Sequence, residues 1–370
     1  MSERTRPPFH AEHVGSFVRP EPLRAARQAW TAGKLPRAEL TALEDECIRD
    51  VVAMQNRLGL PTTSDGEFRR EQWMLVFRES VSGLARETIP GTFKFTQDDG
   101  TVTDTRPVPR VAERLKRTKP LVADEFAWFK PLAKGVPKAT IPSPSMAHHQ
   151  AGDAALDRAV YRDRHEFMAD IVAIYREELD DLAKRGCTYL QIDECAIPVL
   201  CDPRNRAWVE ARGESADANV DFYVDAINAI LKGRPPGMTV TMHMCRGNTG
   251  QGMASGGYEP IAERVFARLD VDGYLLEYDT PRAGDFAPLR FLPKPKMAIL
   301  GLVSTKLKAL EPVDALRARV DEAARFVDLD RIGLCPQCGF ASTFTTARFT
   351  REDEERKLGR VLEAAAAIWR

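Results

Sequence analysis

The chain has 370 residues, with 53 Lys and Arg against 54 Asp and Glu, so its formal net charge is −1. A chain without excess positive charge has no composition-level reason to bind nucleic acid or an anionic membrane surface. Hydrophobic residues make up 44% and charged residues 29%, which is typical of a globular protein and argues against disorder or a fibrous repeat.

Membrane and secretion signals are the next classes that the sequence argues against. There is no run of about 18 apolar residues, so we expect no membrane span. The N-terminal MSERTRPPFH lacks the apolar core of a signal peptide. The seven cysteines are odd in number and irregular in spacing, which does not suit a disulfide framework. We therefore expect a cytoplasmic protein with reduced thiols.

Short β-like runs alternate with longer helical runs along the chain. Most of the β-like runs are apolar or β-branched and are bounded by Gly, Pro or a charge, which is typical of strands buried on both faces of a parallel sheet. The expected strands are His13–Phe17, Thr62–Glu67, Lys138–Pro142, Thr188–Asp193, Thr239–His243, Gly273–Glu277, Met297–Leu302 and Arg331–Cys335.

Helical patterns fill the intervals between these strands. The expected helices are Glu21–Thr31, Arg37–Leu58, Asp157–Arg185, Ala216–Lys232, Glu259–Leu269, Pro312–Phe326 and Arg351–Trp369. Eight strands alternating with helices predict an α/β fold, a (β/α)8 TIM barrel that forms one domain over residues 1–370. A doubly wound open sheet is the structural alternative.

The segment from Ser80 to Val136 breaks this alternation. It contains PGTFKFTQDDGTVTDTRPVP, which predicts two short polar strands around Asp98-Asp99-Gly100. Asp-Gly between β-type runs is a hairpin signal. We therefore expect an insertion at about residues 80–136, after the second strand, that contains a β-hairpin and lies over one end of the barrel.

Polar and metal-binding residues stand at the carboxyl ends of the expected strands, where such barrels bind ligands. His243 and Cys245 are two residues apart and point the same way on an extended strand, so both can reach one metal ion. Glu277 and Cys338 follow other strands. This mixed set suits Zn²⁺. The alternative is that Cys245 and Cys338 are packed thiols. CPQC does not predict a four-cysteine zinc ribbon, because no second CxxC exists.

The segments HVGSF, SDGEFRR, QIDE, HMC and CGF occur in this order at successive strand ends. Together they resemble the catalytic barrel of cobalamin-independent methionine synthase, in a short single-barrel form, over nearly the whole chain. The resemblance implies a zinc-dependent methyltransferase that makes methionine from homocysteine. It implies that the zinc ion is held by His243, Cys245, Glu277 and Cys338 and activates the substrate thiol.

The same resemblance implies a place for the rest of homocysteine. Ser16 of VGSF, Glu67 of DGEF and Asp193 of QIDE match substrate-binding positions of the family. The two carboxylates suit the ammonium group of an amino acid, and the serine supplies part of what its carboxylate needs. Glu277 is also a catalytic candidate, because a catalytic zinc site needs an open position and this ligand can leave or shift as the sulfur arrives.

One segment departs from the family pattern. After the seventh strand the chain reads GLVSTK, so Lys306 stands where the family has a histidine that is thought to protonate the departing folate. We interpret Lys306 as a candidate general acid, although its ordinary pKa of about 10.4 makes it reluctant unless burial lowers it. Two other interpretations stay open: a group that holds an anionic part of the donor or acceptor, and an exposed loop lysine.

The sequence leaves the methyl donor open between methyl-folate and a methylcobalamin-type corrinoid, including one bound to another protein. An alternative function is a zinc-dependent alkyltransferase that acts on another thiol, such as transfer of an epoxide to coenzyme M. The retained Glu67 and Asp193 favour an amino-acid thiol over a sulfonate. A third interpretation is a metal-stabilised barrel without catalysis. A homo-oligomer also stays open.

Overall fold

The computed structural model describes residues 4–91, 94–96, 102–104, 107–247, 254–344 and 348–369. Among these residues the largest sheet has six parallel strands in the order β12-β11-β10-β9-β8-β7. Its strands are β7 Ala139–Pro142, β8 Tyr189–Glu194, β9 Thr239–Met244, β10 Gly273–Glu277, β11 Met297–Val303 and β12 Ile332–Pro336. Nearly every residue in them is buried, as expected for strands covered on both faces.

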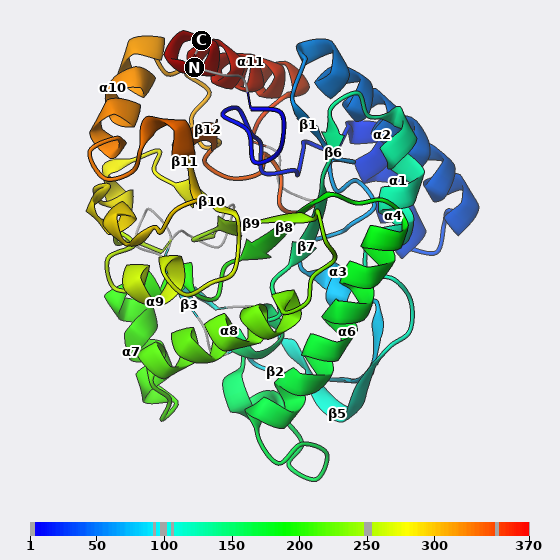
Figure 1. Ribbon diagram of the computed structural model, residues 1–370. Coiled ribbons are helices and arrows are strands. Elements are labelled where there is room, and N and C mark those ends of the chain that lie inside the picture. Colours follow the sequence, from blue (N-terminus) through cyan, green and yellow to red (C-terminus); the bar gives the residue numbers. More distant parts are fainter. Residues whose placement is uncertain are drawn as a thin grey trace.

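Helices surround the strands on the outside (Figure 1). The longer helices are α1 Glu21–Thr31, α2 Arg37–Leu58, α6 Arg164–Lys184, α8 Ala216–Leu231, α10 Val313–Ala323 and α11 Arg351–Trp369. Shorter helices are α3 Leu75–Arg78, α4 Ala123–Phe129, α5 Met146–His149, α7 Pro203–Ala211 and α9 Ala262–Phe266. The 3₁₀ turns are η1 Lys130–Leu132, η2 Gly152–Ala155, η3 Pro198–Cys201, η4 Pro281–Ala283, η5 Ala287–Phe291 and η6 Leu329–Arg331.

The predicted helices agree with the structure to different degrees. The bounds of α1, α2 and α11 are those that the sequence predicted. Helix α6 begins later than expected, because the side chain of Asp163 caps it by accepting hydrogen bonds from the backbone N–H groups of His165 and Glu166. In the described part of the chain, no helix has the length and apolar character needed to cross a membrane.

The expected first strand, His13–Phe17, is not a regular strand. A parallel bridge to β12 lies just before it, between Ala11 and Leu334. Side chains from elsewhere take the carbonyl oxygens that a sheet ladder would use. The pairs are Lys138 Nζ to the carbonyl of His13, Gln191 Nε2 to that of Val14 and Ser64 Oγ to that of Gly15. Because these acceptors are occupied, the segment lies against the sheet without extending its ladder.

The expected second strand, Thr62–Glu67, is also shorter in the structure. Strand β1 covers only Thr62–Thr63 and pairs in parallel with β6, Val136–Pro137. The side chain of Gln55 on α2 then bonds both backbone groups of Ser64, at 2.8 Å to its carbonyl and 2.9 Å from its N–H. The structure thus shows an α/β fold with an open parallel sheet rather than an uninterrupted eight-stranded ladder.

The segment expected as an insertion contains two antiparallel pairs. Strand β2, Val81–Ile89, pairs with β5, Val108–Arg117, and β3, Lys94–Thr96, pairs with β4, Val102–Asp104. The predicted turn at Asp98-Asp99-Gly100 lies outside the described residues. The domain extent of 1–370 and the insertion bounds of 80–136 stay predictions.

Candidate metal centre

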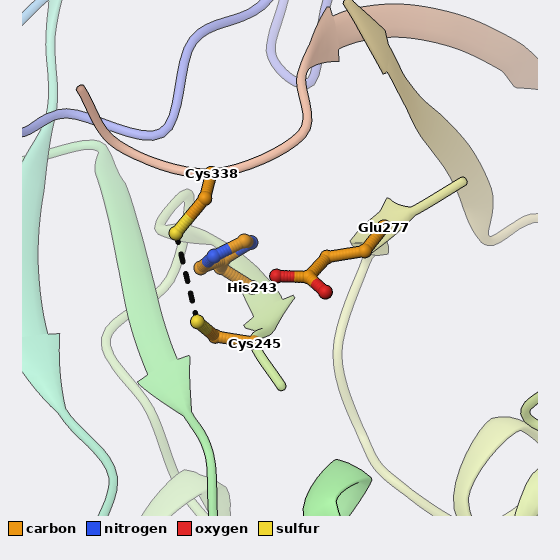
Figure 2. A group of neighbouring side chains, drawn as sticks. All are labelled: His243, Cys245, Glu277 and Cys338. Atoms are coloured by element: carbon orange, nitrogen blue, oxygen red, sulfur yellow. Dashed lines mark hydrogen bonds between the residues drawn. The ribbon is translucent and has the colours of Figure 1, made fainter. Parts of the chain in front are cut away.

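The carboxyl ends of three strands bring together the four side chains predicted to bind metal. His243 lies in β9 and Cys245 directly after it, Glu277 is the last residue of β10, and Cys338 follows β12. One potential ligand atom from each lies within 4.8 Å of the others. Figure 2 shows the two thiols facing each other, with the His243 ring and the Glu277 carboxylate beside them.

Strand geometry explains why these residues meet. Parallel strands end at one edge of a sheet, and side chains two residues apart on a strand share a face. In the register of β9 with β10, His243 lies opposite Leu275, so Glu277 is two residues further along, level with Cys245. The N–H of Cys245 still donates to the carbonyl of Glu194 at 2.8 Å, which keeps the chain extended beyond β9.

The donor atoms fit a zinc ion. The sulfurs of Cys245 and Cys338 are 3.5 Å apart, and two sulfurs each about 2.3 Å from a tetrahedral zinc would be about 3.8 Å apart. Both ring nitrogens of His243 and Oε2 of Glu277 are buried and lack a hydrogen-bond partner among the described residues. Leaving such a polar atom unsatisfied costs about 1–3 kcal/mol. A bound cation would satisfy the Glu277 oxygen and one of the two His243 ring nitrogens.

The protonation state of the two thiols depends on whether such a cation is bound. The hydrogen bond with Cys245, together with burial, raises the pKa of the Cys338 thiol well above its ordinary value. The thiol is therefore neutral when no positive charge is near it. Metal coordination deprotonates a thiol and reverses this preference. Cys335, which we expected near the site but not among the ligands, is buried within weak hydrogen-bond distance of the Ile299 carbonyl, at 4.0 Å.

A small cavity joins the predicted metal ligands to the predicted substrate residues. Its lining contains all three residues predicted to bind substrate and three of the four predicted ligands. The lining residues are Val14, Ser16, Glu67, Trp73, Asp193, His243, Cys245, Cys338, Gly339 and Ser342. A small molecule in this cavity would therefore contact both sets of side chains.

The carboxylates of Glu67 and Asp193 line this cavity, one on a strained backbone and the other with a raised pKa. Glu67 has a positive φ of 61°, which is rare for a residue other than glycine and is a form of strain found at functional sites. Its Oε1 accepts from Thr140 Oγ1 at 3.1 Å, and its Oε2 is buried without a partner among the described residues. Burial and the charge of Glu67 raise the pKa of Asp193 well above its ordinary value. A cationic group between the two carboxylates would relieve this repulsion.

Ser16 is packed closely against the segment that follows Cys338. The N–H of Phe340 donates to the carbonyl of Ser16 at 3.0 Å. A Cβ on Gly339 would overlap Ser16 Oγ and lie 3.1 Å from Ser16 Cβ. The glycine of CGF therefore allows the predicted substrate-binding serine to lie next to a predicted metal ligand.

Lys306 is half-buried after β11 and is not among the residues that line the cavity. Its Nζ donates to Thr305 Oγ1 at 3.3 Å, and its backbone N–H donates to Ser304 Oγ at 3.1 Å. Thr305 in turn donates to Gln337, which donates to Glu277. Lys306 is thus connected to the metal centre through hydrogen bonds and does not contact the four ligands directly.

Sequence reasoning did not identify Gln337 or Tyr258, although both contact Glu277 directly. The signal for Gln337 was its position between the two cysteines of CPQC, next to a predicted ligand. Tyr258 had no such signal, because it lies in the connection from β9 to α9 and 19 residues before Glu277. Its role is seen only in its hydrogen bond to the backbone N–H of Glu277.

Comparisons with known proteins place the chain in a family. The family model for the catalytic domain of cobalamin-independent synthase matches residues 9–365. The uncharacterized protein YxjH of Bacillus subtilis is 36% identical over 371 residues, which covers 100% of this chain and 97% of that protein. The methionine synthase of Pyrococcus furiosus is 23% identical over 88% of this chain and 84% of its own length. The crystal structure of a putative vitamin B12-independent methionine synthase from Listeria monocytogenes has a TM-score of 0.78 at 30% identity, covering 98% of both chains.

Proposed function

Because this chain belongs to the cobalamin-independent methionine synthase family, we propose that it is a zinc-dependent methyltransferase that methylates the thiol of homocysteine to give methionine. The observation that carries the proposal is the cluster of four ligand atoms within 4.8 Å, next to a cavity that also holds Ser16, Glu67 and Asp193. A structural metal site would not need two carboxylates and a hydroxyl beside it.

We also infer that the sheet closes into an eight-stranded barrel through the N-terminal segment. The bridge between Ala11 and Leu334 joins this segment to β12 on one side. On the other side, the N–H of Phe17 donates to the carbonyl of Gly66, just beyond β1, at 3.2 Å. Strand β1 pairs with β6, which is separated from β7 by Lys138 alone.

In the proposed reaction, a zinc ion held by His243, Cys245, Glu277 and Cys338 would supply the positive charge that deprotonates the substrate thiol near neutral pH, whereas a free thiol has a pKa of about 8.5. Glu67 and Asp193 bind the ammonium group of the substrate. Their mutual repulsion makes a cation favourable between them.

Ser16 completes the orientation of the substrate. Its hydroxyl donates to the carboxylate of the amino acid, and its position next to Cys338 sets the distance between that carboxylate and the sulfur. With zinc bound, Glu277 would be the ligand that a substrate sulfur displaces, because a carboxylate oxygen binds Zn²⁺ less strongly than a thiolate does. Zinc sites with a substrate position favour such an exchangeable ligand.

The methyl donor in this proposal is either methyl-folate or a methylated corrinoid, free or bound to a protein. Lys306 is the proposed proton donor to a departing folate, or the group that holds an anionic part of the donor. The second candidate function is a zinc-dependent alkyltransferase that acts on a different thiol. Glu67 and Asp193 favour homocysteine, because a sulfonate acceptor would be repelled by them.

Metal analysis and a two-donor assay test the proposal. Purified protein should hold one zinc per chain, and Cys245→Ser and Cys338→Ser should each lower that content, whereas Cys335→Ser should not. Methionine formation from homocysteine is then measured with methyl-folate and with methylcobalamin in parallel. Protein without stoichiometric zinc would overturn the proposal. Zinc-loaded protein that makes no methionine from either donor would favour the alkyltransferase.

A further inference from the structure

We propose that Gln337 is a positioning residue for the metal centre: it holds Glu277 by one carboxylate oxygen and thereby leaves the other oxygen for the metal. The inference rests on the proposed zinc site and deepens it. The side chain of Gln337 is fully buried, and its Nε2 donates to Oε1 of Glu277 at 2.9 Å. Oε2 of Glu277 is buried and has no hydrogen-bond partner in the described part of the chain.

A second contact fixes which way the Gln337 amide faces. Thr305 Oγ1 donates to Oε1 of Gln337 at 3.0 Å, and Thr305 is itself buried. The opposite amide orientation would place the Gln337 oxygen against the Glu277 carboxylate, where two acceptors would repel each other. The backbone N–H of Gln337 also donates to the carbonyl of Val303 at 2.8 Å, so the residue is anchored to the end of β11.

Glu277 is held at its backbone as well. Its N–H donates to the hydroxyl of Tyr258 at 2.9 Å, and that hydroxyl donates to the carbonyl of Met244 at 3.1 Å. Met244 lies between the ligands His243 and Cys245. Tyr258 therefore fixes the end of β10 relative to the end of β9, and Gln337 then sets the direction of the Glu277 side chain.

The neutral charge of the amide matters for a metal ligand. An arginine or lysine in place of Gln337 would form an ion pair with Glu277 and compete with the cation for the carboxylate charge. An amide restricts the carboxylate without neutralising it. Partners of this kind, which orient metal ligands through hydrogen bonds, typically contribute a factor of about 10–100 to metal affinity.

The experiment measures zinc affinity rather than turnover. Gln337→Met keeps the length of the side chain and removes the donor, and Zn²⁺ affinity is measured by competition with a chromophoric chelator. We expect roughly 10–100-fold weaker binding. Thr305→Val removes the hydroxyl that orients the amide, together with the acceptor of Lys306 Nζ. It should weaken binding by about fivefold, as expected for one neutral hydrogen bond to Gln337. In the Co²⁺-substituted protein, both variants should shift the visible absorption bands that report coordination geometry.

Two controls separate positioning from general destabilisation. Gln55→Met makes the same change at another fully buried glutamine, which bonds Ser64 just beyond β1 and, in the described part of the chain, makes no hydrogen bond with the four candidate ligands. It should lower thermal stability and leave Zn²⁺ affinity within about twofold. In a Glu277→Ala background, Gln337→Met should cause no further loss of affinity, because its effect passes through Glu277.

The outcomes are decisive in each direction. Loss of zinc affinity that disappears in the Glu277→Ala background supports the proposal. Affinity that stays within twofold in Gln337→Met, or a loss that persists in full without Glu277, overturns it. If Gln337→Met does not fold, the affinity of Thr305→Val decides in the same way. A wild-type protein that binds no zinc overturns both this inference and the proposed function, whereas zinc binding without methionine formation affects the proposed function alone.

Discussion

Replacing Gly339 with alanine tests the link between the metal centre and the substrate pocket. The added Cβ would overlap Ser16 Oγ and lie 3.1 Å from Ser16 Cβ and 3.4 Å from the Ser16 carbonyl oxygen. Rotation of the serine hydroxyl can remove the first contact, but the other two involve atoms that the backbone fixes. We therefore expect Gly339→Ala to turn the hydroxyl out of the cavity and to lower the free energy of unfolding by about 1–3 kcal/mol, the usual cost of overpacking.

The effect on substrate binding follows from the loss of one hydrogen bond to a charged group. Such a bond is worth about 1.5–3 kcal/mol, so KM for homocysteine should rise roughly 10–100-fold. Steady-state kinetics give KM, urea denaturation gives the free energy of unfolding, and Ser16→Ala serves as the reference. In the Ser16→Ala background, Gly339→Ala should change KM little. The contact between Gly339 and Ser16 would be refuted as the cause if KM were unchanged in Gly339→Ala. It would also be refuted if Gly339→Ala raised KM by the same factor in the Ser16→Ala background.

Three further predictions concern charge and metal. Dialysis against a strong zinc chelator should abolish methionine formation and lower the midpoint of thermal unfolding, and added Zn²⁺ should restore both; full activity in metal-free protein would contradict the zinc site. The pKa of Asp193 is higher in the folded protein than its unfolded value of about 3.9. The carboxyl therefore favours folding below about pH 3.9, and this contribution is lost as the pH rises through the folded-state pKa. Asp193→Asn should therefore raise the free energy of unfolding at pH 7, and this gain should disappear below about pH 4. The same variant should have a higher KM for homocysteine. A variant that is less stable than wild type at pH 7 would show that the Asp193 carboxylate is not under repulsion. Lys306→Met should lower kcat with methyl-folate by roughly 10²-fold or more if the lysine is the proton donor, and leave zinc content unchanged; an unchanged kcat would assign it no part in proton transfer.

The parts of the fold that local pattern determines could be predicted from the sequence. Pro20 and Pro36 directly precede α1 and α2, and Gly59, in the left-handed conformation, ends α2. The strands from β8 to β12 follow from short apolar runs. The first two expected strands were less accurate, because distant side chains control them. Gln55 ends β1 by bonding Ser64, and Gln191 occupies the carbonyl of Val14. No local pattern around residues 13–17 indicates that their carbonyl oxygens are already in use.

The same distinction applies to the candidate site. His243 and Cys245 could be paired from their spacing on one strand, and Glu277 and Cys338 could be added from their places at other strand ends. Resemblance to a family then implied that all four hold one zinc ion. Gln337 and Tyr258 were missed, because a residue that orients a ligand is recognised by hydrogen-bond geometry and not by its chemical type. Lys306 was placed at the correct strand end, but its connection to Glu277 through two intervening side chains needed the structure.

The N-terminal segment has a consequence for how substrate preference can change among such chains. The carbonyl oxygens of His13 and Val14, just before Ser16, accept hydrogen bonds from two side chains: Lys138, between β6 and β7, and Gln191 in β8. Side chains can be exchanged one at a time, whereas a backbone ladder cannot be altered without moving its neighbours. If Ser16 binds substrate as proposed, substitutions at these side chains would change its position, and with it the choice of thiol, while the candidate metal ligands on β9, β10 and beyond β12 stay where they are.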